Sequence, residues 1–126
     1  MNKYDLQERL IKFSVSIVEL SKDISKNRSG IILGNQLIRS GTSVSLNYGE
    51  AQSAESRKDF IHKMSVVLKE LRETHVCLKI VKRTSNSNFE FKIEKQILES
   101  NELISIFVKS IETAVKNGGK SPIVNR

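Results

Sequence analysis

Apolar residues recur at helical spacing through most of this chain, and this periodicity restricts its fold more than any other feature. In the first segment they are separated by alternating steps of four and three residues. The set is Leu6, Leu10, Phe13, Ile17, Leu20 and Ile24. Such steps place side chains on one face of a helix that packs at a shallow angle against its neighbours. Residues 4–25 are therefore predicted to form a bundle helix.

Two later segments repeat this spacing. Residues 56–84 open with Ser56, a candidate N-cap, and Asp59 follows three residues later, close to a capping box. Residues 89–116 form the last predicted helix, and the only proline, Pro122, lies beyond it. In residues 56–84 the predicted core residues are Phe60, Met64, Val67, Leu71, Leu78 and Val81. In residues 89–116 they are Ile93, Ile97, Ile104, Phe107, Ile111 and Val115.

Residues 31–51 combine the apolar rhythm of Leu33, Leu37, Val44 and Tyr48 with many small side chains. Glycine and serine are poor helix formers, so such a helix needs a tertiary contact to stabilise it. The small residues that would let a neighbouring backbone approach closely are Gly34, Ser40, Gly41, Ser45 and Gly49.

Four amphipathic helices joined by short polar connections, near residues 26–30 and 85–88, predict an all-α protein. The expected architecture is an antiparallel up-down-up-down four-helix bundle over residues 1–117. Residues 118–126, which follow Asn117, are expected to be a flexible tail. The chain shows no signal peptide, no apolar run of about 20 residues and a single cysteine, Cys77. These features favour a cytoplasmic protein that does not enter a membrane.

The net charge of +7 is concentrated in residues 56–86, which hold eight basic and three acidic side chains. At about 100° per residue, six of these bases fall on one side of the predicted helix. This basic face consists of Arg57, Lys58, Lys69, Arg72, Lys79 and Arg83. It could follow a phosphate backbone of RNA or DNA over about 40 Å. The alternative is a solvated face, or one that pairs with acidic residues of another subunit.

Groups suited to catalysis, metal binding or cofactor binding are not found in a recognisable arrangement. Asp59 and His62 form one carboxylate-x-x-His pair, whereas metal sites of helical bundles need two. His75 falls at the core edge of the same helix, where an interior hydrogen bond is the simplest role. Cys77 has no second cysteine at metal or redox spacing. We therefore expect no enzyme activity, no metal and no cofactor.

A polar pattern in residues 36–73 resembles a known family. It comprises Gln36, Arg39, Ser43, Val44, Asn47 and Glu50, followed by Asp59-Phe60 and by Glu73. In order and spacing it is similar to the four-helix-bundle proteins encoded in intervening sequences of 23S rRNA genes, to which the accessory protein of diversity-generating retroelements is related. The chain departs from the pattern at Ile38, where the family has arginine, and at Ala51, where it has glycine.

The resemblance implies a non-enzymatic protein that forms a ring of identical subunits, a pentamer where the assembly is known. The retroelement relatives pair with a reverse transcriptase and bind nucleic acid. The polar residues of the pattern are expected to form a structural network or a subunit contact, because a buried polar group must be paired. A binding or catalytic role is the alternative. These residues are Gln36, Arg39, Ser43, Asn47, Glu50, Asp59 and Glu73.

Two functional hypotheses follow. The first is a homo-oligomeric bundle that binds nucleic acid through its basic face. The second is a scaffold or adaptor whose basic face meets a protein, for example a reverse transcriptase, with no nucleic-acid contact. Salt separates them, because phosphate contacts weaken steeply as salt rises.

Overall fold

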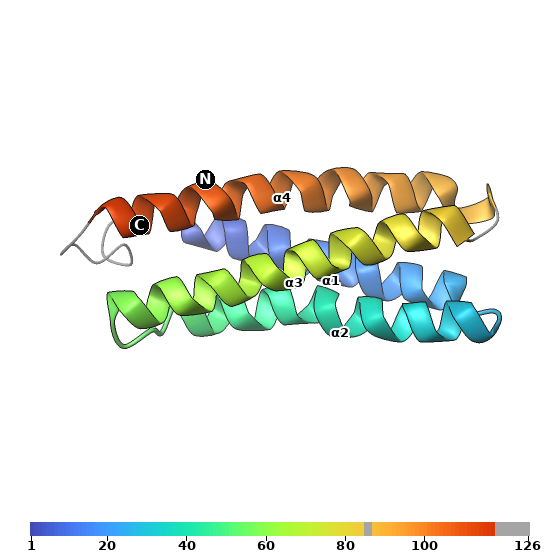
Figure 1. The fold of residues 1–126 in the computed structure, drawn as a ribbon, viewed down its shortest axis with the longest axis horizontal. Helices are drawn as coiled ribbons and strands as arrows, with labels where there is room; N and C mark the ends of the chain where they lie inside the picture. The colour runs from blue at the N-terminus through green and yellow to red at the C-terminus, as the bar shows by residue number, and fades with distance from the viewer. Residues whose placement is uncertain (85–86, 118–126) are drawn as a thin grey trace.

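The computed structural model describes residues 1–84 and 87–117, and it confirms the all-α four-helix bundle. Helix α1 spans Lys3–Ile24, α2 Arg28–Ala51, α3 Arg57–Thr84 and α4 Glu90–Lys116, with a short 3-10 turn, η1, at Ser87–Phe89. Successive helices run antiparallel and lie side by side (Figure 1). No helix in the described ranges is long and apolar enough to cross a membrane. The expected tail, residues 118–126, and positions 85–86 lie outside the described residues.

Three of the four helices begin at side-chain caps, and α4 does not. Asn2 accepts the backbone N–H of Asp5 at 2.9 Å and completes a capping box at the start of α1. At α3 the predicted cap is confirmed, because Ser56 Oγ accepts the Asp59 N–H at 3.0 Å. The predicted loop at residues 26–30 is too long. Asn27 Oδ1 accepts the Gly30 N–H at 2.8 Å, so α2 begins at Arg28 rather than near residue 31.

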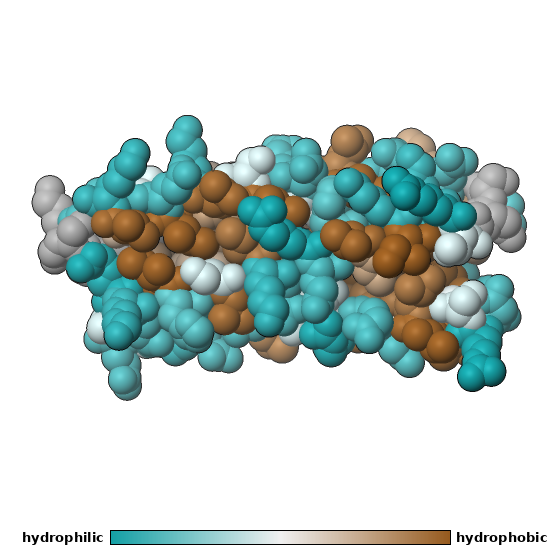
Figure 2. Space-filling view, in the orientation of Figure 1, coloured by the Kyte–Doolittle hydropathy of each residue, from teal (hydrophilic) through white to brown (hydrophobic). Residues whose placement is uncertain are grey.

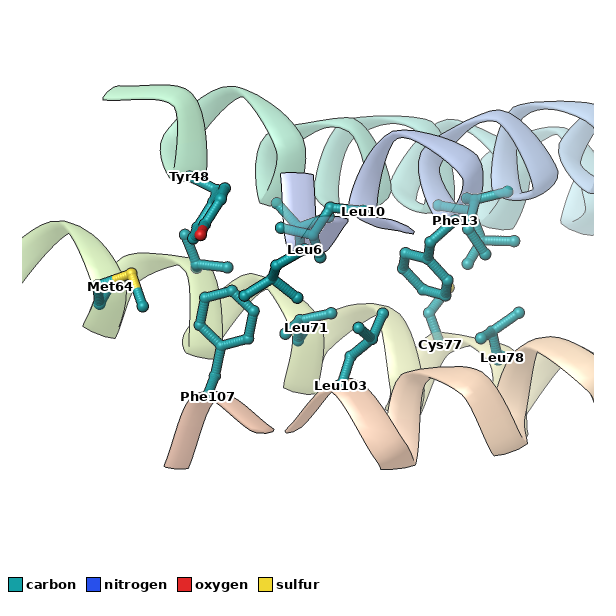
Figure 3. Packing of buried hydrophobic residues seen from close by; sticks show 14 of the residues in the cluster. Leu6, Leu10, Phe13, Tyr48, Met64, Leu71, Cys77, Leu78, Leu103 and Phe107 are labelled. Carbon is teal, nitrogen blue, oxygen red and sulfur yellow. The ribbon is translucent and has the colours of Figure 1, made fainter. Parts of the chain in front are cut away.

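Aliphatic side chains and four aromatic rings fill the core. All six predicted core residues of α1 and all six of α3 are buried. Figure 3 shows Leu6 and Leu10 of α1 and Leu71 of α3 near the rings of Tyr48 and Phe107, which meet edge-on with centroids 5.7 Å apart.

The predicted stripe of α4 is partly wrong. Ile93 and Phe107 are buried, but Val115 is 59% exposed. The inward positions of α4 are Ile93, Gln96, Ser100, Leu103, Phe107 and Ala114. These positions are separated by three, four or seven residues, as expected for one face of a helix. Two of them, Gln96 and Ser100, are polar, so the spacing of apolar residues alone does not identify this face.

Small residues bring α1 and α2 together, as predicted. A Cβ added at Gly41 would lie 2.7 Å from Ile17 Cγ2, so a larger residue does not fit without movement. Beside it, Ser14 Oγ donates to the Gly41 carbonyl at 2.7 Å and lies 2.6 Å from Ser45 Oγ. The expectation fails at Gly49, where nothing lies within 4 Å of an added Cβ.

Candidate nucleic-acid interface

The basic face lies on the solvent side of α3. Five of its six side chains are exposed and Arg57 is half-buried. None of the six forms a salt bridge with any residue in the described ranges. The other two bases of this helix are neutralised, because Lys63 pairs with Asp59 and Lys82 pairs with Glu94. The basic face thus carries the uncompensated charge of α3.

Two of the three acidic residues of α3, Glu70 and Glu73, lie at the boundary with α2. The Arg39 guanidinium contacts the Glu73 carboxylate closely and lies 3.5 Å from Glu70 Oε1. Its hydrogen bond lowers the pKa of Glu73, whereas burial and the adjacent Glu73 carboxylate raise the pKa of Glu70. Arg39 therefore offsets part of the negative charge of these carboxylates, although Glu73 still lines the groove that Lys69 and Arg72 line.

The basic face is interrupted along its length. Lys58 and Lys69 are eleven positions apart, or about 16 Å of helix, and no base projects between them from the same side. The remaining bases form what we call the basic cluster, which extends over about 21 Å. Its members are Lys69, Arg72, Lys79 and Arg83.

Apolar side chains accompany the basic cluster. Val76 and Ile80 are 55% and 45% exposed and lie on the same side of α3. Together with Lys69 and Arg72 they line a groove of about 460 Å³ between α3 and α2. Figure 2, which views the molecule from the side crossed by α3, shows hydrophilic side chains broken by hydrophobic areas. The surface therefore offers positive charge and apolar contact at once.

The seven polar residues of the family pattern do not gather into one network. Gln36, Arg39 and Glu73 meet at the α2–α3 boundary, where Arg39 donates to Gln36 Oε1 at 3.3 Å. Glu70 joins them and was missed by the sequence analysis, although it stands three residues before Glu73 on the same flank. Gln36, Arg39 and Glu73 are exposed, with 51% of the Arg39 side chain accessible, whereas only 15% of the Glu70 side chain is accessible.

The remaining four residues of the pattern act separately. Ser43 Oγ donates to the Arg39 carbonyl and Asn47 donates to the Ser43 carbonyl, so both bond within α2. Asp59 accepts from the Glu55 N–H and from Lys63 at the start of α3. The Glu50 carboxylate is exposed and makes no hydrogen bond or ion pair within the described part of the chain.

Two polar pairs inside the bundle escaped the sequence analysis. Thr74 Oγ1 donates to Ser40 Oγ at 2.8 Å between α3 and α2. His75 Nδ1 lies 2.7 Å from Ser100 Oγ between α3 and α4, which confirms the interior hydrogen bond expected of this histidine. Burial lowers the pKa of His75, and the positive charge of Lys79 adds to that effect. Ser40 also lines the groove beside the basic cluster.

The structure also gives the surroundings of Asp59, a candidate metal ligand, and of the Cys77 thiol. Asp59 binds the N-terminus of α3, and no cluster of three or more metal-ligating side chains exists among the residues described. Cys77 is buried with its Sγ 3.8 Å from the Leu33 carbonyl, and burial raises the pKa of its thiol. The thiol is therefore held in its neutral, poorly nucleophilic form.

Comparison with known proteins places this geometry in a family. A family model described as 23S rRNA-intervening sequence protein matches residues 2–109. A crystal structure of a protein of unknown function from the S23 ribosomal protein family of Bacteroides thetaiotaomicron is 31% identical, with a TM-score of 0.79. The similarity covers 89% of this chain and 99% of that one. Among curated proteins there is no significant match.

Proposed function

The chain belongs to the family of 23S rRNA-intervening sequence proteins, and from this starting point we propose that it is a non-catalytic, homo-oligomeric protein that binds nucleic acid through the basic face of α3. The observation that carries the proposal is the basic cluster of four exposed bases without an intramolecular partner. Long cationic side chains that can each reach a phosphate supply sequence-independent affinity by releasing counterions. We place the protein in the cytoplasm.

Arg39 supports this proposal indirectly. Unpaired carboxylates at Glu70 and Glu73 would lie beside Lys69 and Arg72 in the sequence and would weaken the field that attracts phosphate. By binding both carboxylates, Arg39 offsets one of their two negative charges and so limits this loss of positive potential. The polar pattern of the family thus contributes to the electrostatics of the surface rather than to a reaction.

Self-association is the second part of the proposal. The side of α1 that faces away from the core carries exposed Tyr4, Ile11 and Val15, and the last two line grooves beside Leu98 of α4 and Leu46 of α2. Apolar side chains gathered across three helices are typical of a protein contact. We propose that this surface is covered by another copy of the chain, in a ring of about five subunits.

A protein partner at the basic cluster is the second candidate function. It is favoured by Val76 and Ile80, because apolar side chains at the centre of a basic surface suit a protein or peptide with acidic and apolar residues. Such an interface would depend on packing and would weaken only slightly as salt rises. Nucleic-acid binding is preferred because the bases outnumber the apolar residues and extend beyond the groove.

Binding to labelled RNA and DNA pools over about 50–200 mM salt tests the proposal. The variant K69E/R72E/K79E/R83E should lose binding while keeping its helical circular dichroism. The charge-matched comparison uses the double variants K69E/R72E and K109E/K116E, because Lys109 and Lys116 are exposed and lie outside the two grooves assigned to self-association. Binding that survives in the fourfold variant, or that falls equally in the two double variants, would contradict a specific role of the basic cluster.

A further inference from the structure

The two ends of the bundle differ in charge. The end that carries the α1–α2 and α3–α4 connections, which we call the connection end, includes residues 22–30, 79–84 and 90–94 (Figure 1). These ranges hold seven basic and three acidic side chains, a net charge of +4. The opposite end, with residues 1–9, 50–60 and 109–117, holds six of each and is neutral. The positive potential therefore increases toward the connection end.

Two of the three acidic side chains at the connection end form ion pairs. Lys92 binds Asp23 at 2.9 Å, and Lys82 binds Glu94. Of the remaining bases, Lys22 lies 3.6 Å from Glu19. The bases left exposed and without an ion pair in the described ranges are Lys26, Arg28, Lys79 and Arg83.

All four of these bases lie at the connection end, two of them at the α1–α2 connection and two in the last turns of α3. A cavity of about 280 Å³ separates the α1–α2 connection from the end of α3, and its lining includes Lys26, Ser29 and Thr84. Thr84 directly follows Arg83 in α3. Neighbouring helices of a bundle lie about 8–10 Å apart, so the two pairs of bases are spread over a distance that suits several phosphates of a polymer rather than one small anion.

Arg28 has no stabilising role that the fold explains. It occupies the first turn of α2, where the helix dipole disfavours a cation, and that turn contains no acidic residue. Its side chain is exposed and forms no salt bridge with a described residue. A binding role accounts for a base at this position.

We infer that the phosphate backbone of a bound nucleic acid crosses the connection end of the bundle, held by Lys26 and Arg28 as well as by Lys79 and Arg83. This inference rests on the proposed nucleic-acid binding and extends its site beyond α3.

The test compares K26E/R28E with K109E/K116E, a matched pair of exposed lysines near the opposite end. The probe is a labelled single-stranded RNA, with a DNA of the same sequence alongside, titrated over about 50–200 mM salt. Each lost phosphate contact lowers the slope of log affinity against log salt by about 0.7 for a single strand. K26E/R28E should lower it by about 1.4 and weaken binding at least about tenfold, whereas the control should leave the slope unchanged.

The outcomes distinguish the two proposals. If the wild type binds and K26E/R28E behaves like its control, the connection end is not part of the site, although the basic cluster still is. If the wild type binds neither probe, nucleic-acid binding itself is wrong and both proposals fall. Folding is checked by thermal melting, and K26Q/R28Q removes the charges without reversing them. An acidic residue in the first turn of α2 suits the helix dipole, so R28E should fold.

Discussion

Glycine at position 41 is required by its neighbour rather than by its backbone conformation. The Cβ that any other residue would add meets the side chain of Ile17, whose branching at Cβ leaves few rotamers to escape into. At position 49 the same added atom meets nothing. Replacing glycine by alanine is thus expected to change the free energy of unfolding in opposite directions at these two positions of α2.

Gly41→Ala should lower the free energy of unfolding by about 1–3 kcal/mol, the usual cost of overfilling a packed site. Gly49→Ala should raise it by about 0.5–1 kcal/mol, because alanine is the better helix former in open space. Urea denaturation of the two variants measures both changes. A Gly41→Ala variant as stable as Gly49→Ala would mean that α1 and α2 are not in close contact there.

His75 should make stability depend on pH. Its pKa is lowered in the folded state, so the unfolded chain binds a proton more readily near pH 6. The contribution of the neutral imidazole is therefore complete above the unfolded pKa of about 6.5. It is lost as the pH falls toward the folded value.

The melting temperature should fall between about pH 7.5 and 5.5 more in the wild type than in His75→Gln, which cannot take up this proton. Thermal melts followed by circular dichroism at several pH values measure the difference. Equal slopes for the two proteins would show that the bond to Ser100 does not favour the neutral ring.

For each helix, the spacing of apolar residues identifies the buried face correctly only where the buried residues are themselves apolar. α1 and α3 agree with the prediction because their inward positions are almost all aliphatic or aromatic. The stripe of α4 was misassigned at Val115 because Gln96 and Ser100 occupy inward positions. The start of α2 was misplaced because residues 27–30 look like a turn until the Asn27 side chain is seen to cap them.

The cap of α2 can be tested directly. Asn27→Ala should destabilise the protein by about 1 kcal/mol and fray the turn that holds Arg28, because the Gly30 N–H loses its acceptor. Asn35→Ala is the control, an exposed position inside the same helix where alanine is tolerated or favoured. Hydrogen exchange of the first turn of α2 should quicken only in Asn27→Ala. Unchanged exchange would show that α2 does not depend on this cap.

The candidate site was predictable in composition but not in extent. Helical periodicity alone placed six bases on one side of α3, since that needs only a rotation per residue. The periodicity could not show that Arg39 pairs with Glu70 and Glu73, or that Lys26 and the end of α3 line the same cavity. Both arrangements join residues of different segments, and the spacing of polar residues along one helix does not predict which residues of another segment they lie beside.

For the whole molecule, the prediction of self-association depends on the apolar surface that remains exposed after the four helices have packed. Val15 is 54% exposed and lines both the α1–α4 groove and the α1–α2 groove, so it occupies the middle of the apolar surface assigned to self-association. A charge at this position would be buried without a partner in an assembly but would be hydrated in a single subunit.

Val15→Glu should therefore dissociate the assembly and leave the subunit folded. Light scattering should report about 72 kDa for the wild type, five copies of 14.3 kDa, and a mass near 14.3 kDa for the variant. Val115→Glu, which charges an equally exposed valine outside the grooves, should keep the wild-type mass. A wild type of 14.3 kDa would contradict self-association, and a Val15→Glu variant that stays assembled would move the contact to another face of the bundle.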